Sequence, residues 1–421
     1  MYKVPMSASS PQTLTPDICV IGGTPGGLSV AAAAAGFGVP TVLIERRAMG
    51  GDCLISGSVP SKALLAIAKR AEAIRGAGVF GLDAPNVGVN FVKVHDHVHR
   101  VIAAVARADS AERFRGLGIR VIREHAKFKD RDTVAAGDIE IRARRFVIAT
   151  GSAPALPAIP GLDGGPYLTS ESVFELKERP EHLIIIGAGS VGLEMAQAFR
   201  RLGSSVTVLE AATPLAHDDP ECVAIVLDRL EREGVVIRSG VKVIGIAHAG
   251  GTVTATIEAA GAEQTITGSH LLVAAGRTPR IDGLDLDAAG IRHDGTGIIV
   301  NGKLKTSNRR VYAIGDCAAG HSPLAHAANY HAGLVIRNAL FRCPVRVDSS
   351  AVPWVTYTEP ELAHIGLTEA QAQARRIKIR VTRWPYNDND RAQTEHETHG
   401  LEFRSSQNEN SDFCLTSIAR R

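Results

Sequence analysis

Two glycine-rich turns, each placed between a short apolar strand and a helix, constrain the fold of this chain more than any other feature. The first stretch, DICVIGGTPGGLSVAAAAAGFGVPTVLIER, opens with the apolar run 18–21 and ends its second apolar run at Glu45. The second, HLIIIGAGSVGLEMAQAFRRLGSSVTVLE, has its first strand at 183–186 and ends at Glu210. Each stretch predicts a βαβ unit whose turn lets a pyrophosphate approach the positive N-terminus of the helix.

The two turns supply most of the predicted cofactor-binding residues. These are Gly22, Gly23, Gly26, Gly27 and the ribose-binding Glu45 in the first unit, and Gly187, Gly189, Gly192 and Glu210 in the second. The first unit has one defect, because Thr24 stands where the middle glycine belongs and its Cβ is expected to crowd a phosphate. Glu210 favours NAD over NADP, since a carboxylate accepts from a free 2′-hydroxyl and repels a 2′-phosphate.

Two dinucleotide folds in one chain predict two dinucleotides, one tightly held flavin and one exchanging nicotinamide. Further motifs then make the sequence resemble the FAD-dependent pyridine nucleotide-disulphide oxidoreductases, which include dihydrolipoamide dehydrogenase, glutathione reductase and mercuric reductase. The nearest resemblance is to sequences described as mercuric reductase-like or dihydrolipoamide dehydrogenase-like. The motifs are GGDCLISGSVPSK (50–62), FVIATGSAP (146–154), LLVAAGRTP (271–279), TSNRRVYAIGDCA (306–318) and VPWVTYTEPELAHIGLTE (352–369).

The resemblance implies an α/β fold with two Rossmann-like domains and an α+β dimerisation domain. Residues 1–155 and 281–350 would form the FAD domain, 156–280 the NAD domain, and 351–421 a truncated dimerisation domain with an atypical tail from about 401. Lys62 and Glu194 would form an ion pair beside the flavin ring. By position, the other flavin contacts would be Gly51, Lys62, Ala126, Gly151, Asp316 and Ala325, and the other nicotinamide contacts Val243 and Gly276.

The redox segment departs from the family pattern. Cys53 matches the outer thiol, which exchanges with substrate, but Ser58 replaces the inner cysteine. A hydroxyl forms no disulfide and gives no thiolate near neutral pH. The predicted catalytic set is therefore Cys53, Ser58, Lys62 and Glu194, with impaired disulfide chemistry.

The C-terminus departs further. The family's His-Pro-Thr-x-x-Glu segment, which carries its acid/base histidine, does not occur, and His396-Glu397 is interpreted as a solvated pair. The tail LEFRSSQNENSDFCLTSIARR shows no alternation or helical period, which predicts an unrelated, frame-disrupted or disordered segment. The sheet of the dimerisation domain would then lack strands, and the homodimer that the resemblance implies would be defective. Trp354, Val355 and Ile365 would stay partly exposed.

Two hypotheses from different classes follow. The first is an FAD-dependent oxidoreductase that takes hydride from NAD(P)H and passes electrons to a small acceptor such as a quinone, a dye or oxygen. The alternative is a truncated or pseudoenzyme product that binds dinucleotides without turnover. A dithiol reductase pairing Cys53 with a remote thiol is least favoured, because no other cysteine is placed to reach it.

Composition and the remaining motifs exclude several other classes. The net charge of +3 argues against a nucleic-acid partner, and no apolar run reaches transmembrane length. The absence of an apolar leader and of a disulfide scaffold favours the cytoplasm. Cys19, Cys222, Cys317 and Cys343 are expected to be core thiols, and no terminal cysteine pair supports mercuric ion reduction. In HDHVH only His95 and His99 share a helix face, so a surface helix is preferred and no metal is predicted.

Overall fold

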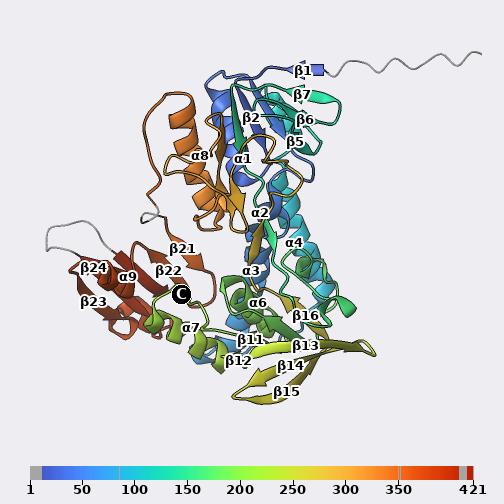
Figure 1. Cartoon of the computed structure of the whole chain (residues 1–421). Coiled ribbons are helices and arrows are strands. Elements are labelled where there is room, and N and C mark those ends of the chain that lie inside the picture. Colours follow the sequence, from blue (N-terminus) through green and yellow to red (C-terminus); the bar gives the residue numbers. More distant parts are fainter. Residues whose placement is uncertain (1–11, 85, 349, 351, 407–414, 421) are drawn as a thin grey trace, which may run out of the picture. The chain divides into compact units, whose positions relative to one another are not determined.

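The computed structural model describes residues 12–84, 86–348, 350, 352–406 and 415–420 (Figure 1). The chain divides into two compact units, each assembled from three separate stretches. The first unit comprises Met1–Leu54, Ala104–Ala153 and Thr278–Val347, and the second comprises Ile55–Ala103, Pro154–Arg277 and Asp348–Arg421.

A five-stranded parallel sheet forms the centre of the first unit. Its strand order is β20-β8-β2-β3-β4. The strands are β2 (Ile18–Ile21), β3 (Thr41–Ile44), β4 (Arg120–Ile122), β8 (Arg145–Ile148) and β20 (Val311–Ala313). Every residue of β2 and β3 is buried, as expected for a parallel sheet that is covered on both faces.

The two faces of this sheet carry different layers. Val20 faces an apolar cluster that includes α1 (Pro25–Gly36) and α8 (Ala325–Ala339), which pack against each other. The next residue of β2, Ile21, faces a second cluster shared with a four-stranded sheet of order β1-β7-β6-β5. That sheet consists of β1 (Gln12–Leu14), β5 (Ala126–Phe128), β6 (Val134–Ala136) and β7 (Ile139–Ile141). The alternation along β2 thus divides the core of the unit into two layers.

The second unit repeats the parallel plan. Its sheet has the order β12-β11-β10-β16 and is formed by β10 (His182–Ile186), β11 (Ser205–Glu210), β12 (Val235–Ser239) and β16 (His270–Val273). Alternate residues of β10 face opposite sides, so that Leu183 lies in a cluster with the helices and Ile184 in a cluster with the antiparallel sheet β13-β14-β15. These elements are α3 (Ser58–Arg75), α4 (Phe91–Ala106), α6 (Ser190–Arg201), α7 (Pro220–Arg232), β13 (Lys242–Ala249), β14 (Thr252–Ala259) and β15 (Ala262–Gly268).

A third sheet in this unit lies at the end of the chain. It is antiparallel, with the order β21-β22-β25-β24-β23. Its strands are β21 (Trp354–Thr356), β22 (Glu361–Ile365), β23 (Arg380–Pro385), β24 (Leu401–Ser406) and β25 (Leu415–Arg420), accompanied by α9 (Glu369–Ala374) and α10 (Asp390–Thr394).

The prediction of a tail without regular structure is wrong for the part of it that is described. β24 and β25 pair with each other, and they connect β22 to β23 within one sheet. Trp354 and Val355 are half-buried, and the Trp354 indole stacks on His364 with ring centroids 4.0 Å apart. Only Ile365 of the three apolar residues named above is exposed. Residues 407–414, with Cys414, lie outside the described residues.

The predicted α/β class and both βαβ units are confirmed. The strand at 18–21 has the predicted bounds, and the strand before Glu45 ends one residue earlier than expected. Residues 55–103, which we assigned to the FAD domain, fall in the second unit. In the described part of the chain, no helix is both long enough and apolar enough to cross a membrane. The assignment of domains to cofactors stays a prediction.

Candidate functional site

The first glycine turn, between β2 and α1, leaves no room for side chains at its two ends. Gly22 has a φ of +108°, and a Cβ there would lie 2.3 Å from the carbonyl oxygen of Ala149. A Cβ on Gly27 would lie 2.0 Å from the carbonyl oxygen of Gly22. Real Cβ atoms do not approach backbone oxygens so closely, so both positions need glycine for the strand, turn and helix to pack.

The second turn, between β10 and α6, has the same requirements. Gly187 also has a φ of +108°, and its Cβ would lie 2.4 Å from the carbonyl oxygen of Ala274. A Cβ on Gly192 would lie 2.0 Å from the carbonyl oxygen of Gly187. At the middle glycine, Gly189, a Cβ would meet no protein atom within 4 Å. The space in front of Gly189 is therefore open to a ligand, which fits a bound pyrophosphate.

The two predicted ribose-binding acids lie against these turns. The Glu45 carboxylate accepts from the backbone N–H of Gly23 at 2.6 Å, and the Glu210 carboxylate accepts from the N–H of Ala188 at 2.7 Å. The second oxygen of each carboxylate accepts from the N–H two residues further along the chain, at 2.6 Å and 2.9 Å. Both acids are thus fixed at the end of the second strand of a βαβ unit, which is the place that a ribose-binding carboxylate requires.

The backbone at Thr24 in the first turn has nearly the same conformation as the backbone at the middle glycine of the second turn. The φ and ψ of Thr24 are −75° and 168°, close to the −75° and −178° of Gly189 in the second turn. The hydroxyl donates to the carbonyl oxygen of Ala149 at 2.8 Å. The methyl group faces Gly51 and Gly151, where added Cβ atoms would lie 3.2 Å and 3.5 Å from it. The crowding expected from Thr24 therefore concerns a bound phosphate rather than the fold of the turn.

The remaining residues predicted to contact a flavin are dispersed over the first unit. The Ser152 hydroxyl donates to the Asp316 carboxylate at 2.5 Å, which joins the start of β9 (Ser152–Pro154) to η4 (Gly315–Cys317). Ala126 begins β5, and Ala325 is the first residue of α8. No described contact brings these two residues to the glycine turn, so their roles stay predictions.

The residues predicted for the nicotinamide side are also spread out. Val243 lies in β13 and pairs with Ile257 of β14. Gly276 follows β16 and has a φ of +115°, and its carbonyl oxygen accepts from the N–H of Ala155 at 2.9 Å. Neither makes a described hydrogen bond with Gly187, Gly189 or Gly192.

The redox segment forms two consecutive helices. Cys53 is half-buried in α2 (Gly51–Ile55), and Ser58 begins α3. The neighbour of Cys53, Asp52, forms an ion pair with Arg280 at 3.0 Å. Cys53 is in no described disulfide, and Ser58 carries a hydroxyl in place of a thiol.

The other cysteines give Cys53 no described partner. Cys19, Cys222 and Cys317 are buried as predicted, and burial raises the pKa of the Cys19 and Cys317 thiols. Cys343 is half-buried, so the prediction of a core thiol is wrong there. It lies beyond the end of α8, two residues after the exposed Phe341. Buried thiols with raised pKa values are poor nucleophiles, because the thiolate is the reactive form.

The predicted ion pair between Lys62 and Glu194 is present in the second unit, with Nζ and Oε2 2.9 Å apart. Glu194 is only 5% exposed, and its other oxygen accepts from the backbone N–H of Tyr357 at 3.0 Å. Lys62 Nζ also lies 4.1 Å from the centre of the Tyr357 ring. Burial, followed by the Glu194 carboxylate, raises the pKa of the Tyr357 hydroxyl. Tyr357 is a member of this cluster that was not predicted from the sequence.

A second charged cluster, also missed, lies further along α6. Arg201 is 3% exposed and forms ion pairs with Glu233 at 2.6 Å and with Glu359. Burial alone would lower the pKa of Arg201, but the two carboxylates outweigh it and raise the value. Gln197, one helical turn earlier, donates to the Glu359 carbonyl at 2.8 Å and accepts from the Glu359 N–H at 2.7 Å. The repeat of polar residues every three or four positions on an otherwise buried helix is the sequence signal that could have revealed this cluster.

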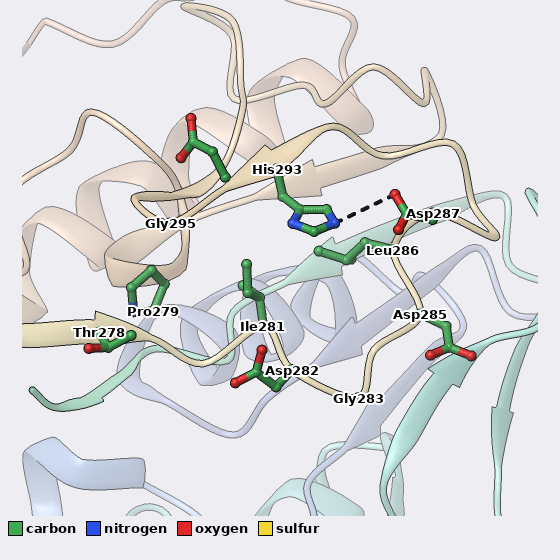
Figure 2. A pocket seen from close by; sticks show the side chains of 11 residues that line it. Thr278, Pro279, Ile281, Asp282, Gly283, Asp285, Leu286, Asp287, His293 and Gly295 are labelled. Atoms are coloured by element: carbon green, nitrogen blue, oxygen red, sulfur yellow. Dashed lines mark ion pairs between the residues drawn. The ribbon is translucent and has the colours of Figure 1, made fainter.

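A pocket of about 530 Å³ lies elsewhere in the first unit and is lined by residues between Thr278 and Gly295 (Figure 2). Asp282, Asp285 and Asp287 line it, and His293 Nε2 lies 3.6 Å from Asp287 Oδ1. None of the predicted catalytic or cofactor-binding residues lines this pocket.

Known proteins resemble this chain over most of its length. It is 33% identical to mercuric reductase from Staphylococcus aureus over 391 residues, which are 91% of this chain and 71% of the relative. It is 33% identical to dihydrolipoyl dehydrogenase from Bacillus subtilis (strain 168) over 394 residues, 91% of this chain and 83% of the relative. The solved Cu(II) complex of the HOCl-induced flavoprotein disulfide reductase RclA from Escherichia coli matches with a TM-score of 0.82 and 26% identity, covering 95% of this chain and 89% of that one.

Two family patterns match the sequence directly. Residues 16–332 match the pyridine nucleotide-disulphide oxidoreductase pattern, and residues 352–402 match the dimerisation domain of the same family. The members of this family use FAD and NAD(P)H. Together with the two glycine turns, these matches show that the chain belongs to the pyridine nucleotide-disulphide oxidoreductase family, with a likeness to mercuric reductase and dihydrolipoyl dehydrogenase.

Proposed function

We propose that this chain is an FAD-dependent oxidoreductase that accepts hydride from NADH and passes electrons to a small-molecule acceptor, with impaired turnover of disulfides. One observation carries the proposal. Each unit has a glycine turn that admits no side chain at its ends, and each turn has a carboxylate hydrogen-bonded to its backbone N–H groups. Because this arrangement occurs once in each unit, it supports the binding of two dinucleotides rather than one.

The residues of the first unit fit FAD. Backbone N–H groups at the start of α1 would bind the pyrophosphate, Glu45 would accept from the ribose hydroxyls, and Asp316 would bind the ribityl chain. In the second unit, the turn of Gly187, Gly189 and Gly192 would bind the nicotinamide dinucleotide in the same way. When bound, the flavin supplies a ring that takes up hydride and releases electrons to an acceptor.

Lys62 would provide a fixed positive charge at the redox site. Its ammonium group is restrained by Glu194 and by the face of the Tyr357 ring. Because Glu194 is almost fully buried, losing Lys62 would leave an unpaired carboxylate in the interior. This pair is therefore expected to hold the Lys62 side chain in one position.

Disulfide reduction needs a second thiol that the described residues do not supply to Cys53. Reducing a disulfide substrate releases two thiols, so the protein must itself pass from dithiol to disulfide. Cys53 can make a mixed disulfide, but the Ser58 hydroxyl cannot resolve it.

Purification and spectroscopy test the proposal. We expect a yellow protein that NADH bleaches, with steady reduction of ferricyanide or a quinone and negligible reduction of lipoamide or glutathione disulfide. Ser58→Cys should add a long-wavelength absorbance band upon reduction, because a thiolate would then be available to the flavin. Ser58→Ala is the matched control and should leave the spectrum unchanged.

Two results would contradict the proposal. A protein that binds no flavin under any loading condition would support the alternative of a dinucleotide-binding product without turnover. Rapid turnover of disulfide substrates by the unchanged chain would show that Ser58 does not impair it. Alkylation of Cys53 by iodoacetamide without prior reduction, absent in Cys53→Ser, would confirm that this thiol has no partner.

We also propose a cytoplasmic homodimer, which the match to the family's dimerisation domain supports. Light scattering over a range of concentrations should show a dimer, and a monomer at every concentration would contradict the proposal. Cell fractionation tests the location.

A further inference from the structure

Three potential metal ligands meet in the second unit, away from the residues assigned above. They are His95 and His99 on α4 and Glu175 at the end of η3 (Val173–Glu175). One potential ligand atom of each lies within 4.8 Å of the others. The sequence showed the two histidines on one helix face but not Glu175, because only the fold brings that residue to them.

The segments that carry these ligands are held by the same apolar core. Phe91, Val94 and Val98 anchor α4 in it, and Val173 and Phe174 anchor η3. A core residue directly precedes each ligand in the sequence, so the backbone that carries each ligand is fixed by packing. A site whose supporting residues are already packed loses little freedom when an ion binds.

The atom that points most directly to a ligand is Nε2 of His99. It is buried and has no hydrogen-bond partner among the described residues. The nearest carboxylate oxygen, Oε1 of Glu175, is 3.6 Å away, beyond a normal hydrogen bond. Two ligands of a tetrahedral zinc ion, each about 2.0–2.1 Å from it, are separated by about 3.3 Å. The observed gap is close to the one that an ion would bridge.

His95 has the arrangement of a metal-binding histidine. Its Nδ1 lies 3.3 Å from the Asp96 carboxylate, and its ring centroid lies 4.1 Å from that of His99. Histidine ligands commonly donate one ring N–H to a carboxylate, which orients the ring and leaves the other nitrogen for the metal. Asp96 would therefore be a positioning residue, with Nε2 of His95 as the ligand atom.

We propose that His95, His99 and Glu175 form a site for one divalent transition-metal ion of the zinc class, with water completing its coordination. Two imidazoles and one carboxylate suit Zn²⁺, Co²⁺ or Ni²⁺ and not the hard cations that prefer oxygen ligands alone. The bound ion would tie η3 to α4 and stabilise the second unit. The site shares no residue with the proposed redox machinery.

Titration of the untagged, EDTA-treated full chain with Zn²⁺ tests the site. Calorimetry should show one equivalent bound, the thermal midpoint should rise, and Co²⁺ should give the intense visible absorbance of a four-coordinate ion. His99→Ala should abolish binding at this site. Glu175→Gln should weaken it at least about tenfold, and Asp96→Asn should weaken it about 10–100-fold, as expected for an orienting partner.

His97→Ala is the matched control, since His97 lies on the same helix but offset from the ligand face. It should bind Zn²⁺ within about twofold of the unchanged chain, as should Cys53→Ser, which removes the half-buried thiol. The proposal would be overturned if the unchanged chain, His99→Ala and Glu175→Gln bound Zn²⁺ equally well. It would also be overturned if His97→Ala lost as much Zn²⁺ affinity as His99→Ala, or if the unchanged chain bound no Zn²⁺ at millimolar concentration. If His99→Ala does not fold, the Zn²⁺ affinity of Glu175→Gln tests the proposal instead, because the Glu175 side chain is 60% exposed and its replacement should leave the fold intact.

Discussion

The two glycine turns have nearly the same backbone but a different residue in the middle, Thr24 in the first and Gly189 in the second. The outer glycines of both turns are required by the protein itself, because any side chain there would strike a backbone oxygen. The middle position meets no such obstacle, and Thr24 even gains a hydrogen bond to Ala149. Folding thus demands the outer glycines, whereas nothing in the protein itself demands a glycine in the middle position.

Alanine at the outer glycine positions is expected to have the largest effect on stability. Gly27→Ala and Gly192→Ala place a Cβ about 2.0 Å from a carbonyl oxygen, so the helix must move away from its strand. Each should lower the free energy of unfolding by about 3–5 kcal/mol, measured by denaturant titration. Gly189→Ala is the matched control and should cost less than about 1 kcal/mol. Equal losses at Gly189 and Gly192 would contradict the comparison.

The second largest effect is expected in the pH dependence of stability, which should differ between the two units. In the first unit, burial, followed by the nearby His321, lowers the pKa of His331 from 6.5 to about 4. Between these two pKa values the unfolded chain binds a proton at His331 and the folded chain does not. The free energy of unfolding is therefore at its full value above pH 6.5 and falls by about 3 kcal/mol towards pH 4.

In the second unit, burial alone would raise the pKa of Glu359, but Arg201 outweighs it and lowers the value below 4.5. Stability from that carboxylate is present above pH 4.5 and is lost only as the pH falls further. His331→Gln should flatten the loss between pH 6.5 and 4 in thermal melts, while His326→Gln, on the same helix, should not. An unchanged slope in His331→Gln would exclude His331 as its cause.

Replacing the middle residue should move stability and flavin affinity in opposite directions. Thr24→Gly removes a hydrogen bond and adds backbone freedom, so unfolding should become easier by about 1–2 kcal/mol. FAD should nevertheless bind about 10-fold more tightly, because the phosphate approach is cleared; flavin fluorescence upon titration measures this. Thr24→Ser keeps the hydroxyl and serves as the control. Weaker FAD binding in Thr24→Gly would show that Thr24 does not obstruct the phosphate.

The smallest effect concerns the choice of nicotinamide. Glu210→Ala should reduce the preference for NADH over NADPH about 5–10-fold in KM, since the carboxylate no longer repels a 2′-phosphate. The corresponding change in the first unit, Glu45→Ala, should leave that preference unchanged and weaken FAD binding instead. A shift of the nicotinamide preference by Glu45→Ala would reverse the assignment of the two units.

Local patterns were enough to predict the parts of this molecule that depend on neighbouring residues. The strands around both turns and the positions of Glu45 and Glu210 follow from short apolar runs and glycine spacing. The Lys62–Glu194 pair came from the resemblance rather than from spacing. Tyr357 and Glu175 could not be predicted, because tertiary packing alone brings them to their partners.

The tail was misjudged for a different physical reason. Leu401 and Phe403 do alternate with polar residues, but the run is too short to stand out from an irregular segment. Its strand character becomes evident only through pairing with β23 and β25. A strand whose hydrogen-bond partners lie elsewhere in the sequence is weakly specified by its own composition.

The cluster of Arg201, Glu233, Glu359 and Gln197 makes the C-terminal sheet an inseparable part of the second unit rather than a detachable module. A protein cut after Val347 would lose Glu359, so Arg201 would keep one carboxylate. Gln197 would keep its hydrogen bond to Glu233, but its amide oxygen would lose the N–H of Glu359. Such a fragment would carry buried polar groups that nothing satisfies. Attempts to shorten this protein to its nucleotide-binding parts, or to graft the sheet onto another relative, must carry these four residues together.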